Sequence, residues 1–388
     1  MQASLTIPGS SPSSSTIPLG VMLLMSKVDE FFRMAPPRRD HIPAFRIAVG
    51  VALPLLTLLI LNRLDLAVYA TFGSFTGIYA RHESRRSRFL RQSFAGAMIT
   101  VCIGIGATLG LFHASTWTIM LVSSLVSAVT ATIAVRFNLK PAGSVFFIFA
   151  TAAIGGIEHG ATPPMAMLVS FLSAGVCVVL GAFTHLIGEG SLPDTTPLVT
   201  KHYQMRDLVG HCVRYFISPF LAGSIGILSI NVLPVLSHPY WAMVASVAPL
   251  ISPQRLARIL RCFHRIIGTL GGIVVAAFLL SFPTEPWQLV VWIIVLQFAG
   301  ELFIARNYSM GMLFITPMAL MMTQLASNFP ATEMLVARAV ETAIGAFVAL
   351  GVVAWGYPAE HQPRIVRQVR SLTREDILHL QLPGIARK

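Results

Sequence analysis

The sequence predicts an all-α membrane protein of about twelve transmembrane helices, built as two parallel six-helix repeats. Apolar residues make up 55% of the 388 positions and charged residues only 11%, which a soluble domain reaches only by exposing large apolar patches. Apolar runs of the roughly 20 residues that a bilayer requires recur along the chain. The two halves also resemble each other in sequence. The lipid bilayer is therefore the first expected partner.

Apolar runs separated by short charged segments locate the expected spans. They cover residues 43–61, 66–80, 93–112, 117–135, 142–157 and 165–187, and then 215–233, 240–252, 266–282, 288–304, 308–325 and 335–356. The predicted organisation is a cytoplasmic tail (1–41), a first six-helix repeat (42–187), a cytoplasmic linker (188–214), a second repeat (215–357) and a basic cytoplasmic tail (358–388).

The distribution of basic residues predicts the orientation. With the amino terminus inside, all of the 28 lysines and arginines except Arg63 and Arg338 fall on the cytoplasmic side or at its border. Positive residues concentrate on the cytoplasmic side of membrane proteins. We therefore expect a multi-pass protein of the inner or plasma membrane with both termini in the cytoplasm. The net charge of +12 is explained by topology, and no nucleic acid is expected as a partner.

An internal repeat appears when the chain is aligned with itself. Residues 69–96 match 241–268 at a shift of 172 positions, and later residues match at a shift of 170. Examples are Ser74 with Ser246 and Arg136 with Arg306. An ordered run of matches across both halves indicates a duplication. Because each half holds an even number of spans, the repeats should be parallel, and the interface between them is the expected pathway.

The second span of each half is short and rich in glycine or proline, which is typical of binding sites in transporters. Broken helices expose backbone groups that can bind a carboxylate. The candidate pore-lining residues are Tyr69 and Ser74 in the first half and Trp241 and Ser246 in the second. The alternative for Tyr69 and Trp241 is a role in the aromatic belt at the membrane interface.

Glu341 is the strongest candidate for chemistry because it lies about two turns inside the last span. Arg338 precedes it by three residues on the same helical face. Glu341 could couple transport to protons while Arg338 meets an anionic substrate. The alternative is a local ion pair that lowers the free energy of insertion.

Three further charged residues are candidates. Glu301 lies about one turn from the cytoplasmic end of its span and is followed by Arg306. Arg306 and Arg136 are related by the repeat and could form a basic mouth, although anchoring at lipid headgroups is the commoner role of such residues. Glu301 and Glu341 correspond to Ala131 and Phe171, so carboxylate chemistry is expected in the second half only.

Other functional classes lack their motifs. The sequence contains no GxxxxGK[ST] or GxSxG motif and no paired histidines with metal-ligand spacing. We therefore expect no enzyme activity, no cofactor and no metal site. The four cysteines share no ligand spacing and are expected to be free thiols.

The chain also resembles a known family. The resemblance rests on Phe45, Arg46, Tyr69, Arg85, Arg86, Arg91 and Gly96, their repetition as Tyr240, Trp241, Arg258, Arg265 and Gly268, and the segment 301–308 with Thr316, Pro317, Arg338, Glu341 and Gly345. These residues are similar to the fusaric acid resistance (FUSC), or aromatic acid exporter, superfamily over roughly residues 43–356. The resemblance implies a proton-driven exporter of aromatic or other organic acids. Larger members carry a cytoplasmic domain between the halves and work with adaptor proteins, whereas this chain has only the short segment 188–214, which leaves an adaptor open.

The leading hypothesis is thus secondary efflux of small organic anions, with a homo-oligomer as a further possibility. Plant malate channels resemble the same six-span unit, so an anion channel is the first alternative. The second is a membrane scaffold or assembly partner without transport, in which the glycine-rich spans serve close helix packing.

Overall fold

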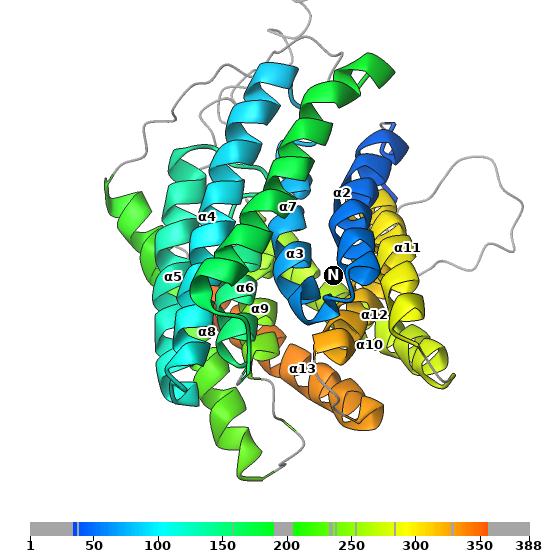
Figure 1. Ribbon diagram of the computed structural model, residues 1–388. Helices are drawn as coiled ribbons and strands as arrows, with labels where there is room; N and C mark the ends of the chain where they lie inside the picture. Colours follow the sequence, from blue (N-terminus) through cyan, green and yellow to red (C-terminus); the bar gives the residue numbers. More distant parts are fainter. Residues whose placement is uncertain are drawn as a thin grey trace, which may run out of the picture.

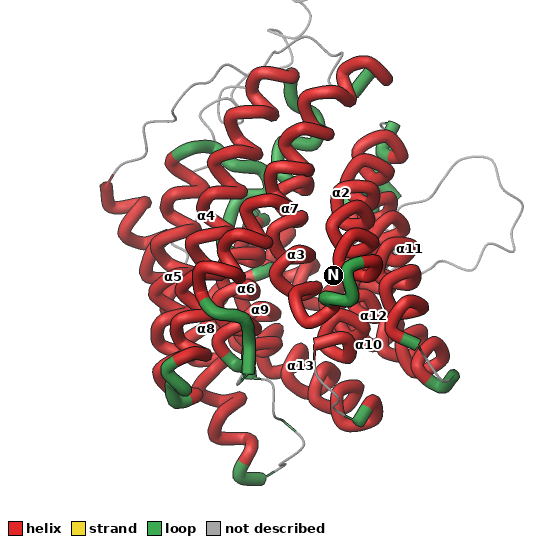
Figure 2. The backbone as a smooth tube through the Cα atoms, viewed as in Figure 1, coloured by secondary structure: helices red, strands yellow, loops and turns green. Residues whose placement is uncertain are grey.

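The computed structural model describes residues 34–36, 39–157, 159–189, 205–232, 236, 239–252, 254–282, 285–326 and 330–355. All regular secondary structure in this part of the chain is helical, as Figure 2 shows. The predicted all-α fold class is therefore confirmed. Most of the two expected tails and residues 190–204 of the expected linker lie outside the described residues.

Nine helices of the described residues are long and apolar enough to cross a membrane. They are α2 (His41–Ile60), α4 (Arg85–Leu111), α5 (Thr116–Arg136), α7 (Pro163–Phe183), α8 (Met205–Ile230), α10 (Arg255–Leu280), α11 (Pro286–Ile304), α12 (Tyr308–Ala326) and α13 (Ala331–Trp355). Large apolar side chains on their outer faces are exposed, including Ile60 at 83% and Val274 at 70%. Such faces suit lipid, since the helices satisfy their own backbone groups.

The other three predicted spans are shorter helices. α3 (Ala67–Ser74) lies between the 3₁₀ turns η1 (Leu64–Leu66) and η2 (Phe75–Ile78), α6 covers Val145–Gly155, and α9 (Tyr240–Val247) leads into η4 (Pro249–Ile251). α3 is buried throughout, and α9 is buried from residue 241 to residue 247. Every predicted span is thus helical, but the count of twelve spans remains a prediction because three of them are shorter than a bilayer requires.

Several helices begin earlier than the apolar runs predict. α4 begins at Arg85 and α10 at Arg255, whereas spans were expected from residues 93 and 266. α8 begins at Met205, within the expected linker. Arginine is a good helix former, so these basic segments extend the helices, and their arginines reach the protein interior.

Local sequence signals define other helix starts. Glu285 and Gln288 form a capping box at α11, and Pro286 occupies its first turn, where the missing N–H costs nothing. The Ser115 hydroxyl accepts a hydrogen bond from the Thr118 N–H at the start of α5, which satisfies one backbone donor that the helix leaves free.

The helices of each half pack in corresponding pairs (Figure 1). In the first half α4 packs on α6 and α7, and α3 packs on α7; in the second half α10 packs on α12 and α13, and α9 packs on α13. Between the halves, α2 contacts α11 and α5 contacts α8. The short helix α3 contacts α12, and α6 contacts α9.

Glycine allows the short helices to approach their partners closely. A Cβ atom at Gly73 of α3 would collide with the backbone carbonyl oxygen of Ser170 in α7. A Cβ atom at Gly345 of α13 would collide with the carbonyl oxygen of Ala242 in α9. Backbone atoms cannot move aside as a flexible side chain can, so both contacts require glycine.

Candidate functional site

Arg338 and Glu341 both lie inside the helix bundle. α13 places them one turn apart, at 2% and 0% exposure. The small residues Ala337, Gly345 and Ala346 on the same helix are also buried, and they let α13 pack closely against its neighbours. An arginine that is buried within a membrane-spanning helix costs at least a few kcal/mol unless something in the protein stabilises it.

Trp241 at the start of α9 lies beside the Arg338 guanidinium. The Arg338 Cζ atom lies 4.9 Å from the ring centroid of Trp241, which is within range of a cation–π interaction. Trp241 is fully buried and meets Tyr240 edge to face. This burial contradicts the belt alternative for Trp241, because a belt residue lies at the membrane surface.

Tyr240 connects this pair to a third helix. Its hydroxyl hydrogen-bonds with Thr323 of α12, and its ring lies within electrostatic range of both Arg338 and Glu341. Residues of α9, α12 and α13 therefore meet around one buried cation and one buried carboxyl group. We call Arg338, Glu341, Trp241 and Tyr240 the Arg338 site.

Hydrogen-bonding capacity at this site is only partly used. The Nε and Nη1 atoms of Arg338 are buried without a hydrogen-bond partner among the described residues. The same holds for the hydroxyls of Thr342, which follows Glu341, and of Thr316 in α12. Buried polar groups are nearly always hydrogen-bonded. A bound anion or water would satisfy donors of this kind, and a carboxylate matches the planar guanidinium best.

The other charged candidates are engaged in ion pairs elsewhere. Glu301 is 3% exposed, and its Oε2 atom lies 2.7 Å from Nη2 of Arg81. Arg306 pairs with Asp40, with 3.0 Å between Nε and Oδ2. Both pairs join the start of the first half to the end of α11. Arg136, in contrast, is exposed at the end of α5, as an anchoring residue would be.

Both candidate serines are buried but hydrogen-bonded within their own helices. The Ser74 hydroxyl donates to the Ala70 carbonyl oxygen, and the Ser246 hydroxyl donates to that of Met243. Each hydroxyl therefore donates its hydrogen within its own helix in this conformation and keeps only acceptor capacity.

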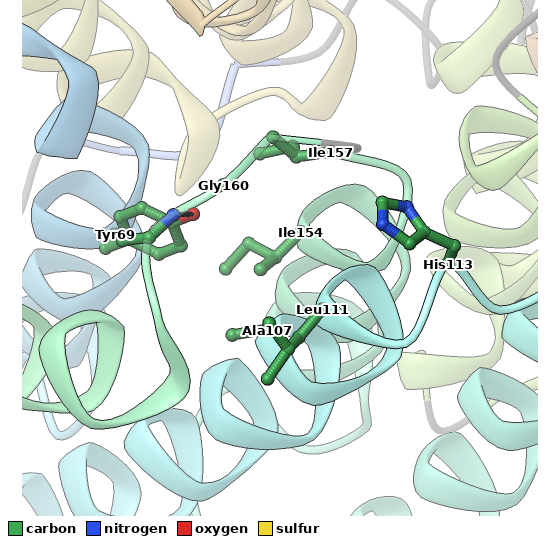
Figure 3. A pocket seen from close by; sticks show the side chains of 8 residues that line it. Tyr69, Ala107, Leu111, His113, Ile154, Ile157 and Gly160 are labelled. Carbon is green, nitrogen blue, oxygen red and sulfur yellow. Dashed lines mark hydrogen bonds between the residues drawn. The ribbon is translucent and has the colours of Figure 1, made fainter.

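Tyr69 borders a cavity of about 70 Å³ near the ends of α4 and α6 (Figure 3). Its ring faces this space together with Ile154, Ile157 and His113, and its hydroxyl accepts a hydrogen bond of 2.9 Å from the Ala161 N–H. Tyr69 is 1% exposed, so it too is buried rather than part of an interfacial belt. Pockets for small organic ligands typically measure about 300–1,000 Å³, so this cavity has room for water only.

A second group of buried charges was not predicted from the sequence. Arg46 of α2 binds the Glu189 carboxylate with two hydrogen bonds, of 2.9 Å from Nε and 3.1 Å from Nη2. Arg88 of α4 lies 3.3 Å from the same carboxylate. Glu83 pairs with Arg91. We call Arg46, Arg88, Arg91, Glu83 and Glu189 the first-half ion network.

Arginines of this network also bind the end of the broken second helix. Nη1 of Arg46 donates to the Gly77 carbonyl oxygen at 2.9 Å, and the Gln92 side chain donates to that of Tyr79 at 3.1 Å. Such donors satisfy carbonyl groups that the short helix leaves free. The sequence separation of 143 residues between Arg46 and Glu189 explains why pattern analysis does not reveal this contact.

The buried charges and the apolar helices together define a multi-pass helical membrane protein. Residues 218–352 match the family described as fusaric acid resistance protein-like. This match confirms the resemblance predicted from the sequence. The matched segment includes α9 to α12 and the whole of the Arg338 site.

The chain spans about a fifth of the length of the curated relatives that it matches. The uncharacterized protein slr1298 of Synechocystis is 27% identical over 162 residues, which are 42% of this chain and 20% of the relative. The uncharacterized membrane protein YvaC of Bacillus subtilis is 26% identical over 137 residues, which are 34% of this chain and 22% of the relative. No solved structure matches the chain.

Proposed function

We propose that this protein is a secondary transporter that exports small aromatic or other organic acids. The observation that supports this most directly is the buried Arg338 guanidinium, which has two unsatisfied nitrogen atoms within the described part of the protein. A carboxylate can accept both N–H groups of an arginine at once. The neighbouring Trp241 ring offers an apolar surface for the body of an aromatic acid.

Glu341 is the proposed coupling group. It lies one turn from Arg338 and is fully buried, so its protonation changes the net charge of the Arg338 site. An anionic substrate binds more favourably when Glu341 is protonated, because the like charge is removed. Proton and substrate would then occupy the site together and cross in the same direction, so export would proceed when the outward gradient of the acid exceeds the inward gradient of protons.

We further propose that the two halves are parallel repeats related by an axis along the membrane normal. The matching helix pairs within each half support this proposal. The contacts between the halves support it as well. In the repeat, α8 is the counterpart of α2 and α11 that of α5, and α2 contacts α11 just as α8 contacts α5. The basic segments at Arg85 and Arg255 would lie in the cytoplasm together with both termini, in the inner or plasma membrane.

The test is transport of radiolabelled benzoate by the full-length protein in proteoliposomes under an imposed pH gradient. We expect wild-type flux to follow the gradient, and Glu341→Gln to abolish that dependence because glutamine cannot release a proton. Glu333→Gln is the matched control, since Glu333 lies exposed on the same helix. An unchanged response to the gradient in Glu341→Gln would contradict the coupling role. Benzoate current that persists without a gradient would instead identify a channel.

A further inference from the structure

Two more arginines of α10 point to a second anion site beside the Arg338 site. The Arg265 Nη1 atom donates a hydrogen bond of 3.0 Å to the Tyr308 hydroxyl, and it lies 3.5 Å from the Met312 sulfur. Arg261 stacks on the ring of the same tyrosine, with its Cζ atom 4.0 Å from the Tyr308 ring centroid. One tyrosine of α12 thus orients two guanidinium groups of α10.

These arginines lie at successive depths in the bundle. Arg255 at the start of α10 donates a hydrogen bond to the Ala354 carbonyl oxygen near the end of α13, so the two helices run antiparallel. At a rise of 1.5 Å per residue, Arg261, Arg265 and Arg338 lie about 9, 15 and 24 Å from this shared end. The three cations therefore form a ladder from one end of the bundle toward its middle.

Glu341 lies within electrostatic range of Arg338, but the ladder has no direct ion pair among the described residues. None of these three arginines forms an ion pair with a carboxylate among the described residues. Arg265 is 4% exposed, and its Nε atom is buried without a hydrogen-bond partner in the described part of the chain. Arg265 and Arg338 are also close enough to repel each other. Buried like charges of this kind are stabilised when an anion binds between them.

The first half provides an internal comparison. α4, the counterpart of α10 in the first half, also carries buried arginines near its start, Arg88 and Arg91. Carboxylates of the protein itself accompany the first-half arginines, since Glu189 lies beside Arg88 and Glu83 beside Arg91. Buried arginines near the start of the corresponding first-half helix are thus accompanied by carboxylates.

We propose that Arg261, Arg265 and Tyr308 form a second binding site for the carboxylate group of a small organic acid, adjacent to the Arg338 site on the side of the α10 start. The inference rests on the proposed transport function and names a second position of the same substrate along its path. Arg265 is too buried to reach lipid headgroups, so the ligand is a soluble carboxylate. Tyr308 positions both cations.

The test is equilibrium binding of radiolabelled benzoate to the full-length protein in neutral detergent. Loss of a hydrogen bond to a charged group weakens binding about tenfold, so we expect that change for Arg265→Gln. Tyr308→Phe should weaken binding to a smaller extent, because the ring below Arg261 remains. Arg255→Gln is the control on the same helix and should leave the affinity unchanged.

A background without Arg338 separates the two positions. Arg338→Gln should retain measurable benzoate binding, and adding Arg265→Gln should remove it. Arg265→Lys preserves the charge but loses the planar fork, so it should fold as wild type and bind benzoate with intermediate affinity. Size-exclusion profiles report folding for each variant. The inference is overturned if Arg265→Gln, or Arg265→Lys where Arg265→Gln does not fold, binds benzoate as tightly as wild type.

Two further outcomes distinguish this inference from the transport proposal. Arg265-dependent binding without any benzoate flux would support the site and contradict transport. Gradient-driven flux without Arg265-dependent binding would support transport and contradict the site. A loss of benzoate binding when phosphatidylglycerol is added would identify a lipid phosphate as the ligand and overturn the assignment to a soluble acid.

Discussion

The two halves of this protein share their helix packing but treat buried arginines differently. In the first half, Arg46 and Arg88 surround the Glu189 carboxylate, and Arg91 pairs with Glu83. In the second half, the buried Arg265 and Arg338 and the half-buried Arg261 have no ion pair within the described residues. The first half thus neutralises its buried arginines with its own carboxylates. The second half leaves cations that an external anion can bind.

This contrast predicts opposite stability effects for two arginine substitutions. The Glu189 side chain is 3% exposed, and Arg46→Gln removes the arginine that binds it with two hydrogen bonds. We therefore expect a loss of about 3 kcal/mol in the free energy of unfolding. Arg338→Gln removes a buried cation whose Nε and Nη1 atoms have no hydrogen-bond partner among the described residues, so it should cost little or even stabilise the protein. Thermal unfolding of both variants in one detergent measures the difference. Equal losses would show that the two halves do not differ in this way.

Glycine substitutions test what the halves share. Gly73→Val and Gly345→Val would each force a side chain against a backbone carbonyl, and overpacking of this kind costs about 1–3 kcal/mol. Gly175→Ala and Gly351→Ala are the controls, since no atom outside the local helix backbone lies within 4 Å of a Cβ at either position in the described part of the chain. Thermal unfolding should rank both valine variants well below both controls. A large loss in only one valine variant would argue against equivalent packing in the two halves.

The smallest effect on stability is expected at the exposed ion pair of Arg63 and Asp65, which serves as a reference for the buried pairs. The Arg63 guanidinium, through its hydrogen bonds, holds the pKa of Asp65 below its usual value. The pair therefore contributes stability above the ordinary aspartate pKa near 3.8, and this contribution is lost as the pH falls through the lowered value. Because the Asp65 side chain is 57% exposed, solvent and salt screen the interaction.

Melting temperatures of wild type and Asp65→Asn between neutral and acid pH measure this contribution. We expect the two curves to differ slightly at neutral pH, to converge at acid pH, and to coincide in high salt. A difference that grows toward acid pH would contradict the sign of the pKa shift.

Hydrophobic patterning predicts the helices well, because lipid exposure imposes a nearly continuous apolar sequence on each span. It does not reveal where the helices begin. Arg265 precedes the apolar run expected from residue 266, yet it is buried within α10. A basic residue beside an apolar run has the same local sequence whether it faces headgroups or the protein interior.

The site was predictable only where one helix carries it. Arg338 and Glu341 are three residues apart in an apolar run, so their burial follows from the sequence. Their contacts with Tyr240 and Trp241 do not, since these lie on another helix. Pairing of Arg46 with Glu189 also depends on tertiary packing, and Glu189 lies in a segment that the sequence alone assigns to a polar linker.

The position of a bound acid decides directly whether the second half holds the substrate. Crystals of the full-length protein with 4-bromobenzoate would show the bromine by its anomalous signal. We predict a peak in the second half, beside Trp241 and Arg338 or between Arg338 and Arg265. A peak in the first half, where 4-bromobenzoate has displaced Glu189 from Arg46 and Arg88, would contradict the account.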